Sequence, residues 1–400
     1  MMSRLPENSP LTYRLSILLL FLAMVSISCW NGSPAELAIP VDYHDPSEVR
    51  SFFENVEAQH PDIARLETVG FSVRGEEIIA LVLSDNPELN EQEPRVRLTG
   101  TIHGNEIISG EILIRLIEEL TGRYGTDPDI KNLVDTRYIV IIPVMNPDGM
   151  WDGRRYNDHD VDLNRNFSTA FVPGGSHGDV AFSEPESAAL RDYSMDKNFH
   201  LSATFHAGTV IVNLPFDYAR MSTGGDIPLE NDLVWELGKI YSMAGTFLAN
   251  PDILADPDVD DGVINGGDWY IAYGSLQDWS YVEKGCIDIT IEIADYSPET
   301  EEGIDEVYAY NRESLLAYID AAGLGVSGYV EDGGGNPLPG VAVKVTDGDI
   351  ITHTDENGWF HRILLDGEHT LEFSLDGYIS ATETVTAPGV LPSPVILTPE

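Results

Sequence analysis

The sequence predicts an α/β domain with a mixed central sheet flanked by helices, followed by a small all-β sandwich. Continuous apolar runs, such as RYIVIIPVMNP and IDITIEIAD, are typical of strands in a sheet that is covered on both faces. Segments with apolar residues at helical spacing alternate with these runs. From Gly323 onward, short alternating strands are separated by turns rich in Gly, Asn, Asp and Pro, which indicates a β-sandwich.

The elements of the α/β part can be placed in order along the chain. A capped helix is expected over 45–57, and extended runs over 66–73 and 78–83. RVRLTGTIH is expected to be a strand, and apolar residues recur at helical spacing from Glu106 to Gly122. Further strands are predicted in 137–147, 201–216 and 287–295, and further helices over 185–195, 230–247 and 305–322.

The N-terminus is predicted to be an export signal. Arg4 and Arg14 flank a polar lead, and LSILLLFLAMVSIS supplies an apolar core that is short for a membrane span. The small residue Ser28 before Cys29, after an apolar core, resembles the cleavage box of bacterial lipoproteins. Ser26 is atypical for the third position before the cleavage point. Lipidation of Cys29 and plain secretion therefore both stay open. We therefore expect an exported protein with three parts: a signal peptide (1–28), an α/β domain (40–323) and a sandwich (324–400).

Charge and cysteine content narrow the set of partners. The formal net charge is −45, which repels nucleic acid and anionic membranes and attracts cations or basic peptides. We expect a monomer that has no nucleic-acid partner and that contacts a membrane only through a lipid anchor at Cys29. Once Cys29 is removed or lipidated, Cys286 stands alone, so no disulfide is expected.

Two potential metal ligands lie where an apolar strand gives way to a helix. His103 closes the strand and Glu106 opens the helix, so both should lie in the crevice at the carboxyl ends of the strands. An imidazole and a carboxylate at this spacing suit one zinc ion, and His206, at the end of another apolar strand, is the best candidate for a third ligand. The alternative is that Glu106 simply satisfies a helix N-terminus.

Five ordered motifs give this pair a context. They are IHGNE, NPDG at 146–149, GRRYNDHDVDLNRNF at 153–167, HAGTVIVNLPFD at 206–217, and NGGDWYIAYGSLQDWSYVEKGCIDITIEIAD at 265–295. Together they resemble the zinc metallocarboxypeptidases, specifically the regulatory branch that contains carboxypeptidases N, E, D and M. The sandwich is similar to the transthyretin-like domain that follows the catalytic domain in that branch.

The resemblance implies a catalytic role for particular residues. It places one Zn²⁺ per chain on His103, Glu106 and His206, with Glu292 as the general base that takes a proton from water. It also assigns Arg155 to the polarisation of the scissile carbonyl. Its neighbour Arg154 is expected to be a solvated side chain.

The same resemblance implies how the substrate is held. Asn164 and Arg165 match the pair that grips the terminal carboxylate, which restricts cleavage to the last peptide bond. Tyr270 matches the tyrosine that closes over the bound residue, although packing beside Trp269 would also explain it.

Two further positions bear on the released residue. Gln277 stands where relatives that release apolar residues carry an aliphatic side chain. Asp217 matches the acidic residue that forms an ion pair with a substrate Lys or Arg. The alternative for Asp217 is a turn residue after Pro215. The predicted function is therefore a zinc metallocarboxypeptidase that releases basic residues from peptides or proteins with a free C-terminus, outside the cytoplasm. Alternatives are an exported peptidase of peptidoglycan stem peptides and a non-catalytic binding or adhesion module.

Overall fold

The computed structural model describes residues 39–40 and 42–400. The predicted signal peptide (1–28) and the lipidation candidate Cys29 lie outside these residues. Across the described part of the chain, no helix combines the length and the apolar character that spanning a bilayer requires.

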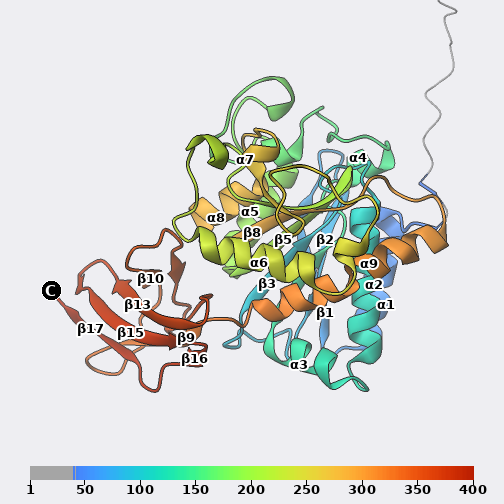
Figure 1. Cartoon of the computed structure of the whole chain (residues 1–400). Coiled ribbons are helices and arrows are strands. Elements are labelled where there is room, and N and C mark those ends of the chain that lie inside the picture. Colours follow the sequence, from blue (N-terminus) through green and yellow to red (C-terminus); the bar gives the residue numbers. More distant parts are fainter. Residues whose placement is uncertain (1–38, 41) are drawn as a thin grey trace, which may run out of the picture. The chain divides into compact units, whose positions relative to one another are not determined.

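An eight-stranded mixed sheet forms the centre of the α/β part (Figure 1), in the order β1-β2-β4-β3-β5-β8-β6-β7. The strands β4, β3, β5 and β8 run parallel to one another, and antiparallel pairs attach β2 to β4 and β6 to β8. The bounds are β1 (Ala64–Phe71), β2 (Glu77–Leu83), β3 (Arg95–Thr99), β4 (Tyr138–Ile142), β5 (Leu201–His206), β6 (Thr209–Leu214), β7 (Val263–Asn265) and β8 (Ile287–Ala294).

Both faces of this sheet are buried, as the continuous apolar runs predict. In β2, Leu81 belongs to one apolar core and Val82 to the other, because successive side chains of a strand point to opposite faces. The first core joins the sheet to α1 (Pro46–Gln59), α2 (Ile108–Arg123), α3 (Pro128–Thr136), α6 (Asn231–Met243) and α9 (Glu301–Ala321). The second joins it to α5 (Pro185–Lys197) and α8 (Leu276–Lys284), while α4 (Pro147–Trp151) and α7 (Gly266–Trp269) are short helices in the loops.

The structure differs from the predicted elements in two places that matter for the site. The run 201–216 is two strands, β5 and β6, which turn at Ala207–Gly208 and lie on either side of β8. Helix α2 begins at Ile108, and Glu106 lies in the preceding turn, where its backbone N–H donates to the carbonyl of His103 (3.0 Å). Glu106 therefore does not open the helix, and its side chain is free to face the site.

The C-terminal part is a β-sandwich with its own apolar core, which contains Phe360 and Phe373. Its strands are β9 (Val326–Asp332), β10 (Ala342–Val345), β11 (Thr352–His353), β12 (Trp359–Arg362), β13 (Gly367–Ser374), β14 (Tyr378–Ile379), β15 (Ala381–Ala387), β16 (Gly389–Val390) and β17 (Val395–Pro399). His361 Nε2 lies 2.8 Å from the carbonyl of Ala322, directly after α9, and the buried Arg362 forms an ion pair with the partly buried Glu230. Polar contacts thus join the sandwich to the α/β part.

Candidate metal centre and active site

Three adjacent parallel strands bring the candidate residues together. His103 follows β3, His206 is the last residue of β5, and Glu292 lies near the end of β8. The order β3-β5-β8 places these strand ends at one edge of the sheet, and His206 pairs directly with Glu292 in the register of β5 and β8. This is the edge at which open α/β sheets gather their ligands.

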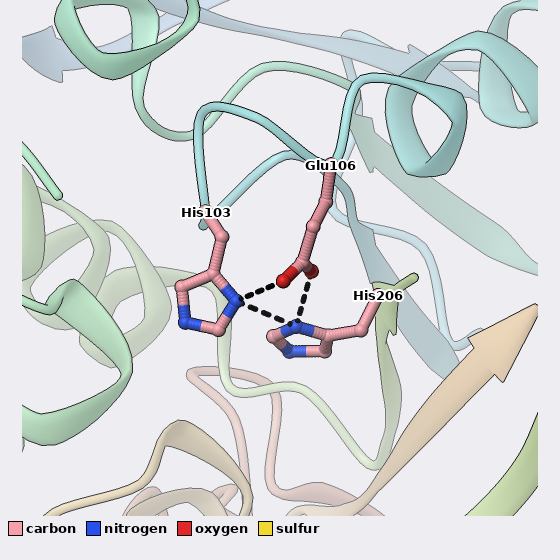
Figure 2. A group of neighbouring side chains, drawn as sticks. All are labelled: His103, Glu106 and His206. Atoms are coloured by element: carbon pink, nitrogen blue, oxygen red, sulfur yellow. Dashed lines mark hydrogen bonds and ion pairs between the residues drawn. The ribbon is translucent and has the colours of Figure 1, made fainter. Parts of the chain in front are cut away.

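His103, Glu106 and His206 converge on one point (Figure 2), and their potential ligand atoms all lie within 4.8 Å of one another. The Nδ1 atoms of the two imidazoles are 3.1 Å apart, and each faces one oxygen of the Glu106 carboxylate, at 2.8 Å for His103 and 2.9 Å for His206. Two nitrogens bound tetrahedrally to one zinc ion would be separated by roughly 3.3 Å. The donor set and its spacing therefore fit a zinc ion with two imidazoles and one carboxylate.

A second carboxylate orients the first imidazole. Asp162 Oδ1 lies 3.1 Å from His103 Nε2, so a proton on Nε2 leaves Nδ1 free as a ligand. Asp162 is buried, which alone would raise the pKa of its carboxyl, but the charges of His103, Arg155 and Arg165 outweigh burial and hold the pKa well below its usual range. Asp162 lies within the motif at 153–167, but the sequence alone indicated no role for it.

Glu292 is a buried carboxylate beside this centre. Its Oε2 has no hydrogen-bond partner among residues 39–40 and 42–400. Burial, and after it the charge of Glu106, raises the pKa of Glu292 to about 8. An unpartnered buried carboxyl with a raised pKa next to a candidate metal site is able to exchange a proton with a reacting group.

Arg155 reaches the same site from a loop. Its Nε donates to Asp162 (2.9 Å) and its Nη1 lies 3.3 Å from Glu106 Oε1. Asp162 therefore binds both Arg155 and His103, and fixes the guanidinium relative to the candidate metal ligands.

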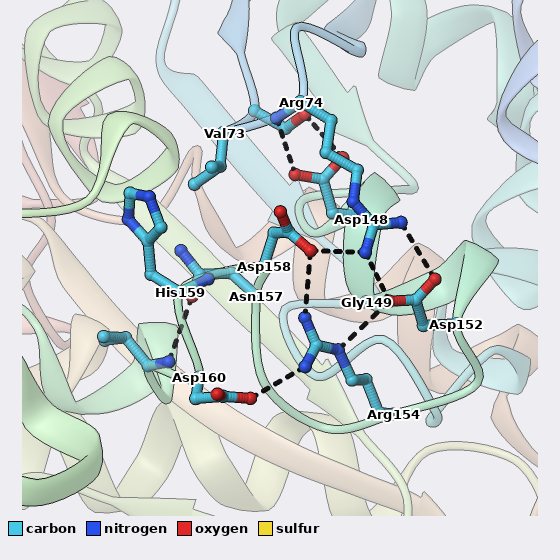
Figure 3. Close-up of polar contacts among 12 residues, drawn as sticks. Val73, Arg74, Asp148, Gly149, Asp152, Arg154, Asn157, Asp158, His159 and Asp160 are labelled. Atoms are coloured by element: carbon cyan, nitrogen blue, oxygen red, sulfur yellow. Dashed lines mark hydrogen bonds and ion pairs between the residues drawn. The ribbon is translucent and has the colours of Figure 1, made fainter.

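Ion pairs hold the loop that carries Arg155 (Figure 3). Arg74 pairs with Asp152 and Asp158. Arg154 pairs with Asp158 (3.3 Å) and Asp160 (2.7 Å), so the expectation of a merely solvated Arg154 is wrong. Arg155 directly follows Arg154 in the chain, so these pairs also restrain the backbone at Arg155.

Asn164 and Arg165 continue the same segment. Asn164 Oδ1 accepts from the backbone N–H of Leu276 (2.9 Å), and Arg165 Nη1 donates to the carbonyl of Asn164 (2.7 Å). Tyr270 is 42% exposed and packs edge-on against Trp269, with the ring centroids 4.6 Å apart. The pKa of Tyr270 is raised by partial burial, and its phenol also lies within the electrostatic range of Arg165. The aromatic contact expected from the sequence and the proximity to Arg165 thus occur together.

Asp217 lies in a buried polar group that we call the Asp217 cluster, formed by Asn213, Asp217 and Gln277. Asp217 Oδ1 accepts from Asn213 Nδ2 (3.1 Å) and Gln277 Nε2 (2.7 Å). The remaining amide oxygens, Asn213 Oδ1 and Gln277 Oε1, are buried and lack partners within the described part of the chain. Gly266 covers the cluster, since a Cβ there would lie 2.0 Å from Asp217 Oδ1. Burial raises the pKa of Asp217, and the hydrogen bonds to its carboxylate and the charge of Arg165 offset this rise only in part. The sequence did not suggest Asn213.

Comparison with known protein families agrees with this geometry. The profile of the zinc carboxypeptidases matches residues 49–314, and that of the carboxypeptidase regulatory-like domain matches residues 325–396. The chain belongs to the zinc carboxypeptidase family. The predicted family and fold class are thereby confirmed, as are the enzyme class and zinc as its cofactor. A zinc carboxypeptidase hydrolyses the C-terminal peptide bond of substrates with a free C-terminus, so the chain is an enzyme rather than an adhesion module.

Curated relatives extend over most of the chain. Carboxypeptidase M of Mus musculus is 30% identical over 379 residues, which cover 90% of this chain and 84% of the relative. The carboxypeptidase N catalytic chain of Mus musculus is 32% identical over 375 residues, with 84% and 81% covered. Human carboxypeptidase D is 30% identical over 382 residues, but these cover only 27% of that larger protein and 91% of this chain.

Solved structures support the fold. Carboxypeptidase A from Helicoverpa armigera superposes with a TM-score of 0.60 at 20% identity and covers 70% of this chain and 73% of its own. Bovine thrombin-activatable fibrinolysis inhibitor, solved in complex with tick carboxypeptidase inhibitor, gives a TM-score of 0.58 at 20% identity, with 70% and 97% covered. At 20% identity, these two structures support the fold and nothing further.

Proposed function

We propose that this zinc carboxypeptidase releases C-terminal arginine or lysine from peptides or proteins outside the cytoplasm. The observation that carries the proposal is the Asp217 cluster, a buried carboxylate flanked by two unpartnered amide oxygens. Such a set of acceptors binds a cationic side chain with several N–H donors far more strongly than an apolar side chain.

His103, Glu106 and His206 would hold the zinc ion, since their ligand atoms converge and fit its spacing. When bound, zinc supplies Lewis-acid chemistry that lowers the pKa of a water and polarises a carbonyl. Glu292 accepts a proton from the attacking water and returns it to the departing amine, a role supported by its burial and its raised pKa. The Arg155 guanidinium, anchored by Asp162, stabilises the negative charge that develops on the carbonyl oxygen.

Binding of the chain end restricts the reaction to the last bond. Arg165 and Asn164 bind the terminal carboxylate, because the planar guanidinium suits bidentate pairing and an internal peptide bond offers no such group. Tyr270, which is 42% exposed, is available to cover the bound residue. Exopeptidase action then follows from a requirement for binding.

The Asp217 cluster further favours arginine over lysine. A guanidinium has five N–H donors in a planar fork and an ammonium has three. The carboxylate, Asn213 Oδ1 and Gln277 Oε1 together require several donors directed at separate acceptors. An ammonium has three donors on a single nitrogen, whereas a guanidinium spreads its donors over three nitrogens and can reach acceptors that lie apart. Each buried oxygen that a lysine leaves unpaired costs about 1–3 kcal/mol.

The test uses purified protein lacking residues 1–29 and matched peptides that end in Arg, Lys, Phe or Leu. We expect kcat/KM to be highest for Arg, then Lys, with Phe and Leu lower by about a hundredfold, because a charged pair in a buried site is worth about 2–3 kcal/mol. Amidation of the C-terminus should abolish cleavage, and a chelator should abolish it reversibly.

Asp217→Asn supplies the matched control. It should reduce kcat/KM for the Arg and Lys peptides by about a hundredfold and leave the Phe and Leu peptides nearly unchanged. Preference for Phe or Leu in the parent enzyme would refute basic specificity, and preferential release from muropeptides would favour the stem-peptide alternative.

The extracellular site of action is supported by the signal-like segment 1–28 and the strongly acidic composition. Expression of the full chain with and without Cys29→Ser tests the mode of attachment. Membrane fractionation that depends on Cys29 would indicate a lipid anchor, and release of both forms into the medium would indicate plain secretion. Retention of both in the cytoplasm would refute export.

A further inference from the structure

We infer that the C-terminal sandwich positions the substrate-selecting Asp217 cluster through helix α8, and that Asp349 is the residue that transmits this support. The inference rests on the proposed role of Asp217. It assigns to the sandwich a part in substrate selection, beyond stabilising or docking.

The contact begins at a loop of the sandwich. Asp349 lies between β10 and β11, and its Oδ1 accepts from the Tyr281 hydroxyl (2.6 Å). Its Oδ2 accepts from the backbone N–H of Leu229 (2.9 Å), next to the N-terminus of α6. Tyr281 is 2% exposed, and burial together with Asp349 raises the pKa of its phenol, so the hydroxyl stays protonated and donates.

Helix α8 links Tyr281 to the Asp217 cluster. Gln277 and Asp278 stand four and three residues before Tyr281, so the three side chains share one side of the helix. Gln277 donates to the Asp217 carboxylate, and the Asp278 carboxylate accepts from the backbone N–H groups of Asp217 (3.0 Å) and Tyr218 (3.3 Å). The Tyr281 ring also packs edge-on against Phe216, at 5.5 Å between centroids. The helix that Asp349 holds therefore fixes both the side chain and the backbone of Asp217.

The far end of α8 is confined by the same sandwich loop. Gly285, which ends the helix at φ +63°, packs so tightly that a Cβ would lie 1.9 Å from the carbonyl oxygen of Ile351. The neighbouring Ile350 donates its N–H to Glu230 (3.2 Å), and Glu230 also pairs with Arg362 of the sandwich. A shift of this loop cannot occur without a shift of α8, because close-packed contacts transmit displacement.

The experiment compares Tyr281→Phe, Asp349→Ala and the double variant in the chain lacking residues 1–29. The substrates are two peptides that end in arginine or in citrulline, its neutral isostere. Each single variant should reduce the Arg-to-citrulline ratio of kcat/KM by about fivefold through a higher KM for the Arg peptide, while kcat for the citrulline peptide stays within about twofold. The double variant should lose no more than Asp349→Ala alone, because that variant already lacks the hydrogen bond that Tyr281→Phe removes.

The control is Glu356→Ala, which removes a contact of Glu356 with Asn90 (3.0 Å) between the sandwich and the α/β part without touching α8. It should leave the ratio at the parental value. An unchanged ratio in Tyr281→Phe, or additive losses in the double variant, would overturn the inference while basic specificity stands. Tyr281→Phe removes a single oxygen and decides the question even if Asp349→Ala fails to fold. Absence of any preference for arginine in the parent enzyme would instead refute the proposed function.

Discussion

Asp162→Asn should weaken zinc binding and catalysis together. The Asp162 carboxylate accepts three hydrogen bonds, from His103 Nε2 (3.1 Å), Arg155 Nε (2.9 Å) and the backbone N–H of Asn164 (3.0 Å). The first two donors face different oxygens. An amide has one oxygen, so whichever way it is oriented, its NH₂ group meets one of these donors.

The size of the effect follows from those contacts. Loss of the partner of a metal-bound imidazole typically costs 10- to 100-fold in metal affinity, about 1.4–2.7 kcal/mol. If the amide oxygen instead stays on His103, the NH₂ group faces the guanidinium and Arg155 loses a charge-assisted bond worth about 1.5–3 kcal/mol. If the NH₂ group faces His103, we expect a zinc dissociation constant about 10- to 100-fold higher. If it faces Arg155, we expect a kcat/KM about 10- to 100-fold lower at saturating zinc. If both orientations are populated, both quantities should change by smaller factors.

Competition for zinc against a chromophoric chelator measures the first quantity, and hydrolysis of the Arg-ended peptide at saturating zinc measures the second. Asp160→Asn is the matched control, because Asp160 lies on the same loop but contacts Arg154. Wild-type values for both quantities in Asp162→Asn would refute the reasoning, as would equal losses in Asp160→Asn.

Three further outcomes are expected. Glu292→Gln should lower kcat by at least about a thousandfold with one zinc ion still bound by elemental analysis, because it removes the proton acceptor; undiminished turnover would remove Glu292 from the mechanism. Glu93→Gln should raise the unfolding free energy by about 1 kcal/mol at pH 8 and leave it unchanged at pH 4 in urea titrations. Burial raises the pKa of Glu93 from 4.5 to about 7, so the folded state is not penalised below pH 4.5, where the carboxyl is neutral in both states. As the pH rises from 4.5 towards 7, ionisation favours the unfolded chain and the parent protein loses stability, which the neutral Gln does not. Asp288→Asn should cost about 3–5 kcal/mol in the same assay, since it leaves the buried Arg97 guanidinium without its carboxylate partner at 2.6 Å, whereas Ser194→Ala should cost only about 1 kcal/mol.

Periodicity located the buried strands well, because a strand covered on both faces must be apolar at every position. It failed at α8, the helix on which the further inference depends. The buried positions of α8 run consecutively from Leu276 to Tyr281 and include polar side chains, so no apolar stripe marks this helix of nine residues. Its boundaries were readable, however: Ser275 caps the first turn through Asp278, and Gly285 ends the helix in a left-handed conformation. Capping residues would have found this helix where hydrophobic spacing did not.

The candidate site divides in the same way. Motif spacing suggested His103, Glu106 and His206, whose ligand atoms the fold brings within one ion's reach. The contacts of Asp162 could not be deduced, because they depend on which nitrogen of His103 faces Glu106 and which is left for Asp162. Asn213 could not be deduced either, because its amide reaches Asp217 only through the turn that follows β6. The contact of Asp162 with His103 comes from the tertiary structure, and that of Asn213 with Asp217 comes from a local turn that strand periodicity does not reveal.

The position of β8 makes catalytic competence depend on a late part of the chain. This strand is the last of the eight to be translated, yet it inserts between β5 and β6 and carries Glu292. A growing chain possesses every candidate zinc ligand once His206 has emerged, but it has neither a proton acceptor nor a continuous sheet until the ribosome has added almost ninety more residues. A product that ends before β8 would lack both the proton acceptor and the strand that joins β5 to β6, so hydrolytic competence arises only when the centre of the sheet is completed.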